Sequence, residues 1–292
     1  MSYQSPSTEP SPRIPVNAWG LVLRVIIAVA VLLGANIIRA PSSAWLKEPA
    51  NSQSGDTAEG VLISALIFLL TPLLVFIFLA AWMPLIERRG LELISFPRWR
   101  GILPGLTGGT LTVAIPVAIA WLIAMLLAEP VDVESLTAEM STQGEISGAL
   151  AFSYIVYFFV RSFLLQGIPE EFLYRGWLFC TTKSKPIFTL IWTTLAFAVI
   201  HLASSGGQQS TSDFVLYLAM PLSMGAIAGA VVLWTDNTWW AAGTHGGFHV
   251  LLTLLSMLFP IALDSSTWVV FGSTQVLAAI IITSAWWKRE RK

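Results

Sequence analysis

The chain contains eight apolar segments, each long enough to cross a lipid bilayer as a single helix. They occupy residues 19–38, 61–82, 106–127, 148–166, 186–203, 214–234, 239–259 and 268–287. A hydrocarbon core of about 30 Å needs roughly 20 apolar residues per helical crossing. Hydrophobic residues make up 55% of the chain and charged residues only 11%, whereas a soluble domain carries about 25% charged residues. The sequence therefore predicts an all-α integral membrane protein of about eight transmembrane helices.

Basic residues outside these segments are distributed unevenly. Eleven Lys and Arg side chains fall on the side that holds both termini, and only Arg39 and Lys47 fall on the other. Cytoplasmic loops of membrane proteins carry an excess of Lys and Arg. We therefore expect both termini in the cytoplasm, as an even number of crossings requires, and we expect the membrane to be a bacterial plasma membrane.

The chain divides into a polar N-terminal tail (1–18), a multi-pass membrane domain (19–287) and a short basic cytoplasmic tail (288–292). The N-terminal tail is rich in Ser and Pro, a composition typical of disorder. It has no basic lead and no small-residue cleavage site, so the first apolar segment is not predicted to be a signal peptide.

Net charge and cysteine content exclude further classes of protein. The formal net charge is −1, so nothing indicates a nucleic-acid partner. The single cysteine, Cys180, excludes an intrachain disulfide framework and stands in no metal-binding spacing, so we expect a small buried apolar side chain. No cofactor is expected.

The fourth apolar segment continues past Gln166 and carries two adjacent glutamates, Glu170 and Glu171. Because Pro169 removes a backbone donor, we expect the helix to break near residues 167–169, with Glu170 in the first turn of a new helix. Glu171 and Arg175 have the i, i+4 spacing of a helical ion pair, and this pair leaves Glu170 to face a cavity. The alternative is that both glutamates are structural or that the segment is a solvated turn.

All three histidines lie in the same hydrophobic region as these glutamates. Ionisable side chains at membrane depth are rare and usually line a cavity or take part in chemistry. His201 follows an apolar helical run, where a packing role is the common alternative. His245 and His249 share one helix face through their i, i+4 spacing. The grouping favours a catalytic site within the membrane.

Three motifs resemble those of a known family. PEEFLYRG at residues 169–176 matches EExxxR, and Phe197 with His201 matches FxxxH. The run from Ser223 to His245 matches the last motif region, which ends in HxxxN or HxxxD. The chain thus resembles the CPBP family of intramembrane glutamic endopeptidases, which contains CAAX prenyl proteases and bacteriocin-processing and self-immunity proteins. The resemblance covers about residues 148–260.

This resemblance implies a role for each matched residue. Glu170 would activate a water molecule, His201 would help to hold it, and His245 with His249 would stabilise the oxyanion. The site-supporting residues would be Glu171, Arg175 and Phe197. One position departs from the family pattern, because His249 stands where asparagine is usual. The implied partners are a peptide or protein substrate, including prenylated CAAX-type substrates, and membrane lipid.

Two other functions remain open from the sequence. Three histidines and a glutamate are also a zinc-ligand set, as in a metalloprotease, although the HExxH signature is absent. A non-catalytic membrane scaffold or immunity protein would use the same cavity to bind partner helices. A transporter is a weaker alternative, because no inverted repeat is visible.

Overall fold

The computed structural model describes residues 11–45, 57–96, 99–127, 147–203, 208 and 210–292. These residues form helices and connecting turns, and no β-strand occurs among them. The predicted all-α fold is confirmed. Residues 1–10 of the predicted polar tail lie outside the described residues.

Seven helical stretches in the described part of the chain are long and apolar enough to cross a membrane. They are Ala18–Arg39, Ala58–Glu87, Arg100–Leu127, Gly148–Thr181, Thr211–Thr235, Thr238–Leu258 and Ser265–Glu290. The remaining predicted crossing, 186–203, is a shorter apolar helix, α9 (Pro186–Ile200), followed by the 3-10 turn η5 (His201–Ala203). Each apolar segment of the sequence therefore corresponds to a helix of the structure.

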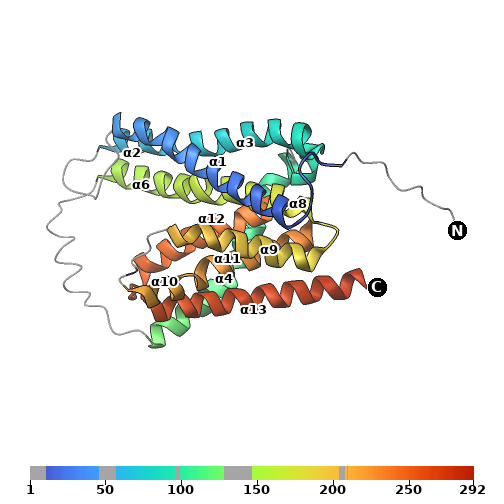
Figure 1. Cartoon of the computed structure of the whole chain (residues 1–292). Coiled ribbons are helices and arrows are strands. Elements are labelled where there is room, and N and C mark those ends of the chain that lie inside the picture. Colours follow the sequence, from blue (N-terminus) through green and yellow to red (C-terminus); the bar gives the residue numbers. More distant parts are fainter. Residues whose placement is uncertain (1–10, 46–56, 97–98, 128–146, 204–207, 209) are drawn as a thin grey trace.

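Figure 1 shows the long helices running side by side in one bundle. One side of the bundle is formed by α1 (Ala18–Trp45), α2 (Ala58–Ile67), α3 (Leu70–Trp82) and α6 (Gly148–Val160). The other side is formed by α9, α10 (Thr211–Tyr217), α11 (Ala219–Thr235) and α13 (Ser265–Glu290). Helix α12 (Thr238–Leu258) lies between them and contacts both α4 (Trp99–Leu127) and the helix that carries Glu170.

Glycines bring α4 and α12 into backbone contact. A Cβ atom on Gly109 would collide with the carbonyl oxygen of Trp240, and one on Gly243 would lie 2.5 Å from that of Leu106. Across the same interface, Thr110 Oγ1 donates a hydrogen bond to the carbonyl oxygen of Gly243 at 3.1 Å. Small residues allow such close packing between membrane helices, and here they fix the helix that carries His245 and His249.

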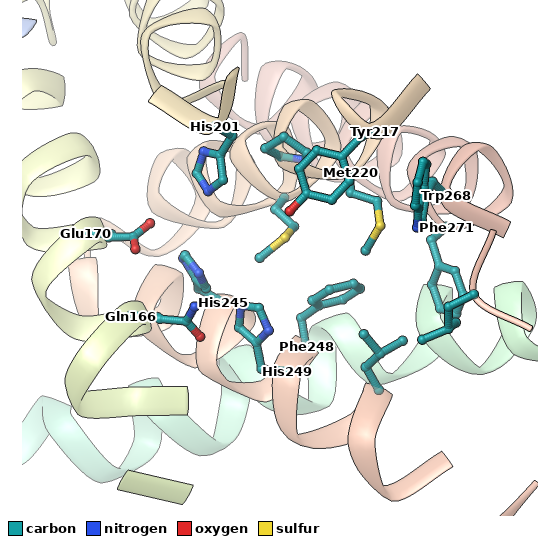
Figure 2. Close-up of a pocket in the computed structure, with 14 residues that line it drawn as sticks. Gln166, Glu170, His201, Tyr217, Met220, His245, Phe248, His249, Trp268 and Phe271 are labelled. Atoms are coloured by element: carbon teal, nitrogen blue, oxygen red, sulfur yellow. The ribbon is translucent and has the colours of Figure 1, made fainter. Parts of the chain in front are cut away.

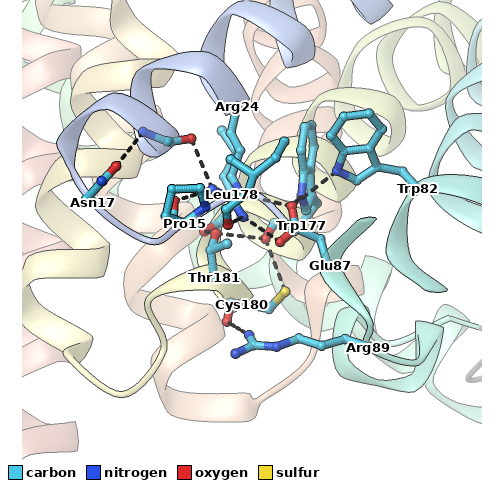
Figure 3. A network of polar contacts seen from close by, with 12 residues as sticks. Pro15, Asn17, Arg24, Trp82, Glu87, Arg89, Trp177, Leu178, Cys180 and Thr181 are labelled. Atoms are coloured by element: carbon cyan, nitrogen blue, oxygen red, sulfur yellow. Dashed lines mark hydrogen bonds and ion pairs between the residues drawn. The ribbon is translucent and has the colours of Figure 1, made fainter. Parts of the chain in front are cut away.

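A buried polar network ties α1 to the rest of the bundle (Figure 3). Arg24, an arginine within the first apolar segment, is fully buried and pairs with Glu87 at the end of the π-helical turn η1 (Met83–Glu87). Arg24 Nε donates to Glu87 Oε1 at 2.8 Å and Arg24 Nη2 donates to Oε2 at 2.7 Å. Oε1 also accepts from the indole N–H groups of Trp82 and Trp177, at 3.1 Å and 2.8 Å. Both charges are therefore hydrogen-bonded within the apolar bundle, as buried ions require.

The same network extends to residues outside α1. Arg24 donates to the carbonyl oxygens of Ile14 and Pro15, which precede the helix. Cys180 lies at the other edge of the network, where its thiol donates to the carbonyl oxygen of Trp177 at 3.1 Å. Cys180 is buried, in agreement with its predicted role as a small packing residue.

Candidate active site

The helix that carries Glu170 runs without interruption from Gly148 to Thr181. After α6 it passes through the π-helical turn η3 (Arg161–Gly167), α7 (Ile168–Glu171), a second π-helical turn η4 (Phe172–Leu178) and α8 (Phe179–Thr181). The predicted break at residues 167–169 is therefore wrong. Glu170 lies in α7, inside this continuous helix, and not in the first turn of a new helix as expected.

The π-helical turn explains how the helix continues through Pro169. The amide of Ile168 donates to the carbonyl oxygen of Phe163, five residues earlier. Proline interrupts an α-helix because its ring meets the carbonyl group of residue i−4, and the wider π-turn before Pro169 relieves that contact. The helix therefore has no free end at this point, and space for reactants comes from a side-chain cavity.

The cavity lies among the motif-bearing helices and has a volume of about 550 Å³. Its lining includes all the predicted catalytic side chains. The full lining is Gln166, Glu170, His201, Tyr217, Met220, Pro221, Met224, His245, Phe248, His249, Leu252, Leu263, Trp268 and Phe271. Figure 2 shows Glu170, Gln166 and the three histidines gathered at one end, with Trp268 and Phe271 at the other. The cavity therefore has a polar end and an apolar end.

Glu170 directs its carboxylate into the polar end of the cavity (Figure 2). Its Oε2 atom is buried and makes no hydrogen bond to any residue that the structure describes. A buried carboxylate oxygen without a partner is costly. Such an oxygen is suited to accept a proton or a hydrogen bond from a molecule that enters the cavity.

His201 begins the 3-10 turn η5 at the end of α9 and lines the same cavity. Its Nδ1 atom lies 2.8 Å from the carbonyl oxygen of Phe197. Because a carbonyl oxygen only accepts, Nδ1 carries the proton and donates. In the neutral imidazole, Nε2 is then an acceptor. The Phe197 ring, 4.6 Å from the imidazole between ring centroids, packs against it.

Glu171 is not among the residues that line the cavity, and its carboxylate binds two side chains, those of Arg175 and His245. Oε2 of Glu171 lies 3.2 Å from Arg175 Nη1, so the ion pair expected from their spacing is present. Oε1 accepts a hydrogen bond from His245 Nδ1 at 2.9 Å. No sequence pattern indicated this second contact. It fixes the proton of neutral His245 on Nδ1 and makes Nε2 an acceptor.

Arg175 is buried, and its guanidinium lies against two residues of neighbouring helices, Phe197 and Gly225. Its guanidinium carbon lies 4.5 Å from the centre of the Phe197 ring, within the range of a cation–π contact. A Cβ atom on Gly225 would lie 2.6 Å from Arg175 Nη2. Gly225 therefore leaves the space that the guanidinium occupies, and Phe197 contacts both Arg175 and His201.

His249 lies next to His245 along α12 and also lines the cavity. The two imidazole centroids are 5.3 Å apart and the ring planes are inclined by 35°. Phe248 borders His249 on the apolar side, with ring centroids 5.6 Å apart. His249 is thus placed with the other candidate residues at the polar end of the cavity.

Two polar residues that line the cavity were absent from the predicted site. Gln166 lies four residues before Glu170, and Tyr217 ends α10. A glutamine within an apolar segment was a signal for the first, because such a group needs a polar partner or a cavity. Tyr217 gave no signal, because tyrosine is common near the ends of membrane helices.

The side-chain arrangement does not favour the zinc alternative. Within the described ranges, no three His, Cys, Asp or Glu side chains are grouped so that they could hold a metal ion. The Nδ1 atoms of His201 and His245 are already bonded to Phe197 and Glu171.

Comparisons with known proteins give one match. No curated protein and no solved structure matches the chain. The family model described as type II CAAX prenyl endopeptidase Rce1-like matches residues 152–251. This range contains Glu170, His201, His245 and His249. The resemblance seen in the sequence motifs is therefore confirmed over residues 152–251, which are similar to the Rce1-like type II CAAX prenyl endopeptidases.

Proposed function

We propose that this protein is an intramembrane endopeptidase of the CAAX type that hydrolyses peptide bonds with a glutamate-activated water molecule. The observation that carries the proposal is that Glu170, His201, His245 and His249 line the same cavity within the apolar bundle. The match of residues 152–251 to a family of CAAX prenyl endopeptidases supports the same class of reaction. Glu170 and His201 bind the water, and His245 and His249 stabilise the charge that develops on the substrate.

Two acceptors hold the water. Oε2 of Glu170 is unbonded to any described residue, and Nε2 of neutral His201 accepts because Nδ1 donates to Phe197. A water molecule that donates one hydrogen to each acceptor has an oxygen lone pair available for attack. Glu170 takes one proton as the oxygen bonds to the carbonyl carbon of the substrate. It then gives that proton to the nitrogen of the leaving amine as the carbon–nitrogen bond breaks.

Stabilisation of the oxyanion requires N–H donors in the cavity. His245 donates from Nδ1 to Glu171, so its Nε2 donates to an oxyanion only when the imidazole is protonated. The carboxylate of Glu171 stabilises that imidazolium. His249 donates from one ring nitrogen when neutral and from both when protonated. An oxyanion donor of this kind contributes about 3–4 kcal/mol to transition-state stabilisation.

The apolar end of the cavity fits an apolar part of the substrate. Met220, Trp268 and Phe271 line this end, and methionine side chains adapt to groups of different shape. A peptide with apolar side chains or a prenylated cysteine would place that group there and its scissile bond beside Glu170. The substrate of this proposal is a peptide or protein, with CAAX-type prenylated sequences as its leading class.

The proposed location is a bacterial plasma membrane, with both termini in the cytoplasm. The excess of Lys and Arg on the terminal side supports this orientation. In Figure 1 the start of α1 and the end of α13 lie at the same end of the bundle, in agreement with an even number of crossings. The membrane domain spans residues 19–287 in this proposal.

A peptide library tests the function. Purified wild-type protein and Glu170→Gln are incubated in detergent with diverse peptides, in unmodified and farnesylated forms, and the products are identified by mass spectrometry. The proposal predicts defined cleavage by the wild type and none by the variant. Cleavage only of farnesylated members would establish the prenylated class. Equal cleavage by both proteins would contradict the assignment of Glu170.

A further inference from the structure

Gln166 is the only carboxamide among the residues that line the described cavity. It lies at the end of η3, four residues before Glu170, so both side chains project from nearly the same face of one helix. Figure 2 shows its amide pointing toward the imidazoles of His245 and His249 from the helix opposite α12. Gln166 is thus at the polar end of the cavity, beside the proposed reacting groups.

The other polar groups at this end offer few donors in their neutral forms. Glu170 acts as a proton acceptor, and the Nδ1 protons of His201 and His245 are donated to Phe197 and Glu171. Only His249 keeps an imidazole N–H for the cavity. A carboxamide supplies two N–H donors in every protonation state of the site.

An oxyanion is stabilised best by donors that are held in place before the charge develops. Gln166 meets this requirement because it is carried by a helix that packs directly on α12. A Cβ atom on Gly167 would lie 2.9 Å from the amide nitrogen of Gly246, so the two backbones are in contact at this level. The position of Gln166 relative to His245 and His249 is therefore fixed by the backbone packing.

From this arrangement we infer that Gln166 is a further catalytic residue, which donates an amide N–H to the carbonyl oxygen of the scissile peptide. It acts together with His249, from the facing helix. The inference rests on the proposed function, since it assigns a role within the same site.

The test compares steady-state kinetics of the full-length protein and Gln166→Met, which keeps the side-chain length and removes both N–H donors. We expect kcat to fall about 100-fold, the loss typical of one oxyanion donor, while KM changes less than about threefold. Gln166→Ala gives a second variant in case methionine does not pack. Asn36→Leu on α1 is the matched control, because its amide bonds to the carbonyl oxygen of Leu32 in the same helix and lies outside the cavity lining. This control should leave kcat unchanged.

A double variant provides an independent readout. If Gln166 and His249 bind the same oxygen, the loss in Gln166→Met combined with His249→Ala should differ from the product of the two single losses. Wild-type kcat in both Gln166 variants, with Glu170→Gln inactive, would overturn this inference and leave the proposed function intact. Full activity of Glu170→Gln would overturn the proposed function itself.

Discussion

The Nδ1 atom of His245 donates a hydrogen bond to Oε1 of Glu171 at 2.9 Å. This contact joins α7, which carries both adjacent glutamates, to α12. It gives the two glutamates different surroundings. Glu171 is paired with Arg175 and His245, while Oε2 of Glu170 makes no hydrogen bond to a described residue. One carboxylate therefore holds the site together and the other faces the cavity.

Stability measurements should separate the two glutamates. Glu171→Ala leaves the guanidinium of Arg175 buried without its counter-ion, and breaking a buried pair costs about 3–5 kcal/mol. Glu170→Ala removes a carboxylate that no described partner satisfies, so it should cost little or increase stability. Denaturant unfolding in detergent measures the free energy of unfolding of both. An equal loss in the two variants would show that Glu171 has no special structural role.

Gly225→Ala should displace Arg175. The new Cβ atom would lie 2.6 Å from Arg175 Nη2, so the guanidinium must shift from the position in which it pairs with Glu171. We expect a loss of stability of about 1–3 kcal/mol and lower activity. Gly34→Ala on α1 is the control, because nothing lies within 4 Å of its Cβ position. There the substitution should be neutral or stabilise the helix by up to about 1 kcal/mol. Thermal unfolding of both variants makes the comparison, and a Gly225→Ala protein as stable as Gly34→Ala would contradict the packing account.

The Arg24–Glu87 pair should contribute far more to stability than an exposed pair. Both side chains are buried, and Glu87→Ala leaves Arg24 without its carboxylate. We expect a loss of about 3 kcal/mol or more in the free energy of unfolding. Lys183 and Asp236 form an ion pair whose side chains are 45% and 63% exposed, so Lys183→Ala should cost less than about 1 kcal/mol. Similar losses in the two variants would contradict the buried network.

The N-cap of α13 should make a small pH-dependent contribution. Asp264 accepts hydrogen bonds from the hydroxyl of Ser266 at 2.7 Å and the amide of Thr267 at 3.0 Å, and these bonds lower the pKa of its carboxyl. A lowered pKa means that the stabilisation is complete above the ordinary aspartate value of about 4 and is lost as pH falls through the lowered value. Asp264→Ala should lose about 1 kcal/mol at pH 7. The difference from wild type should shrink below about pH 4, as followed by thermal unfolding at each pH. A difference independent of pH would show that the carboxylate charge has no part in the cap.

The helical bundle could be predicted from the sequence because few backbone structures can span a membrane. Each backbone polar group in the hydrocarbon must be paired within the protein, so a long apolar segment must become a helix. The Glu171–Arg175 pair followed from its spacing on one helix. The residue types and the family resemblance also predicted one site formed by Glu170, His201, His245 and His249. These four residues line one cavity.

Other features depended on contacts that no local pattern encodes. His245 and Glu171 are 74 residues apart in the chain, so their hydrogen bond required the packing of α12. The rule that proline ends a helix failed at Pro169, because the π-helical turn η3 precedes it. In the sequence, Gln166 marks the end of an apolar segment, and only the folded cavity shows that its side chain lies beside the histidines.

The most direct test of the central claim is the rate of peptide cleavage by wild type and Glu170→Gln, each measured with and without a strong zinc chelator. The variant's free energy of unfolding is measured in the same preparation. A glutamate-activated water predicts that chelation leaves the wild-type rate unchanged and that Glu170→Gln is inactive but at least as stable as wild type. Chelator-sensitive cleavage, or a fully active Glu170→Gln protein, would contradict the account.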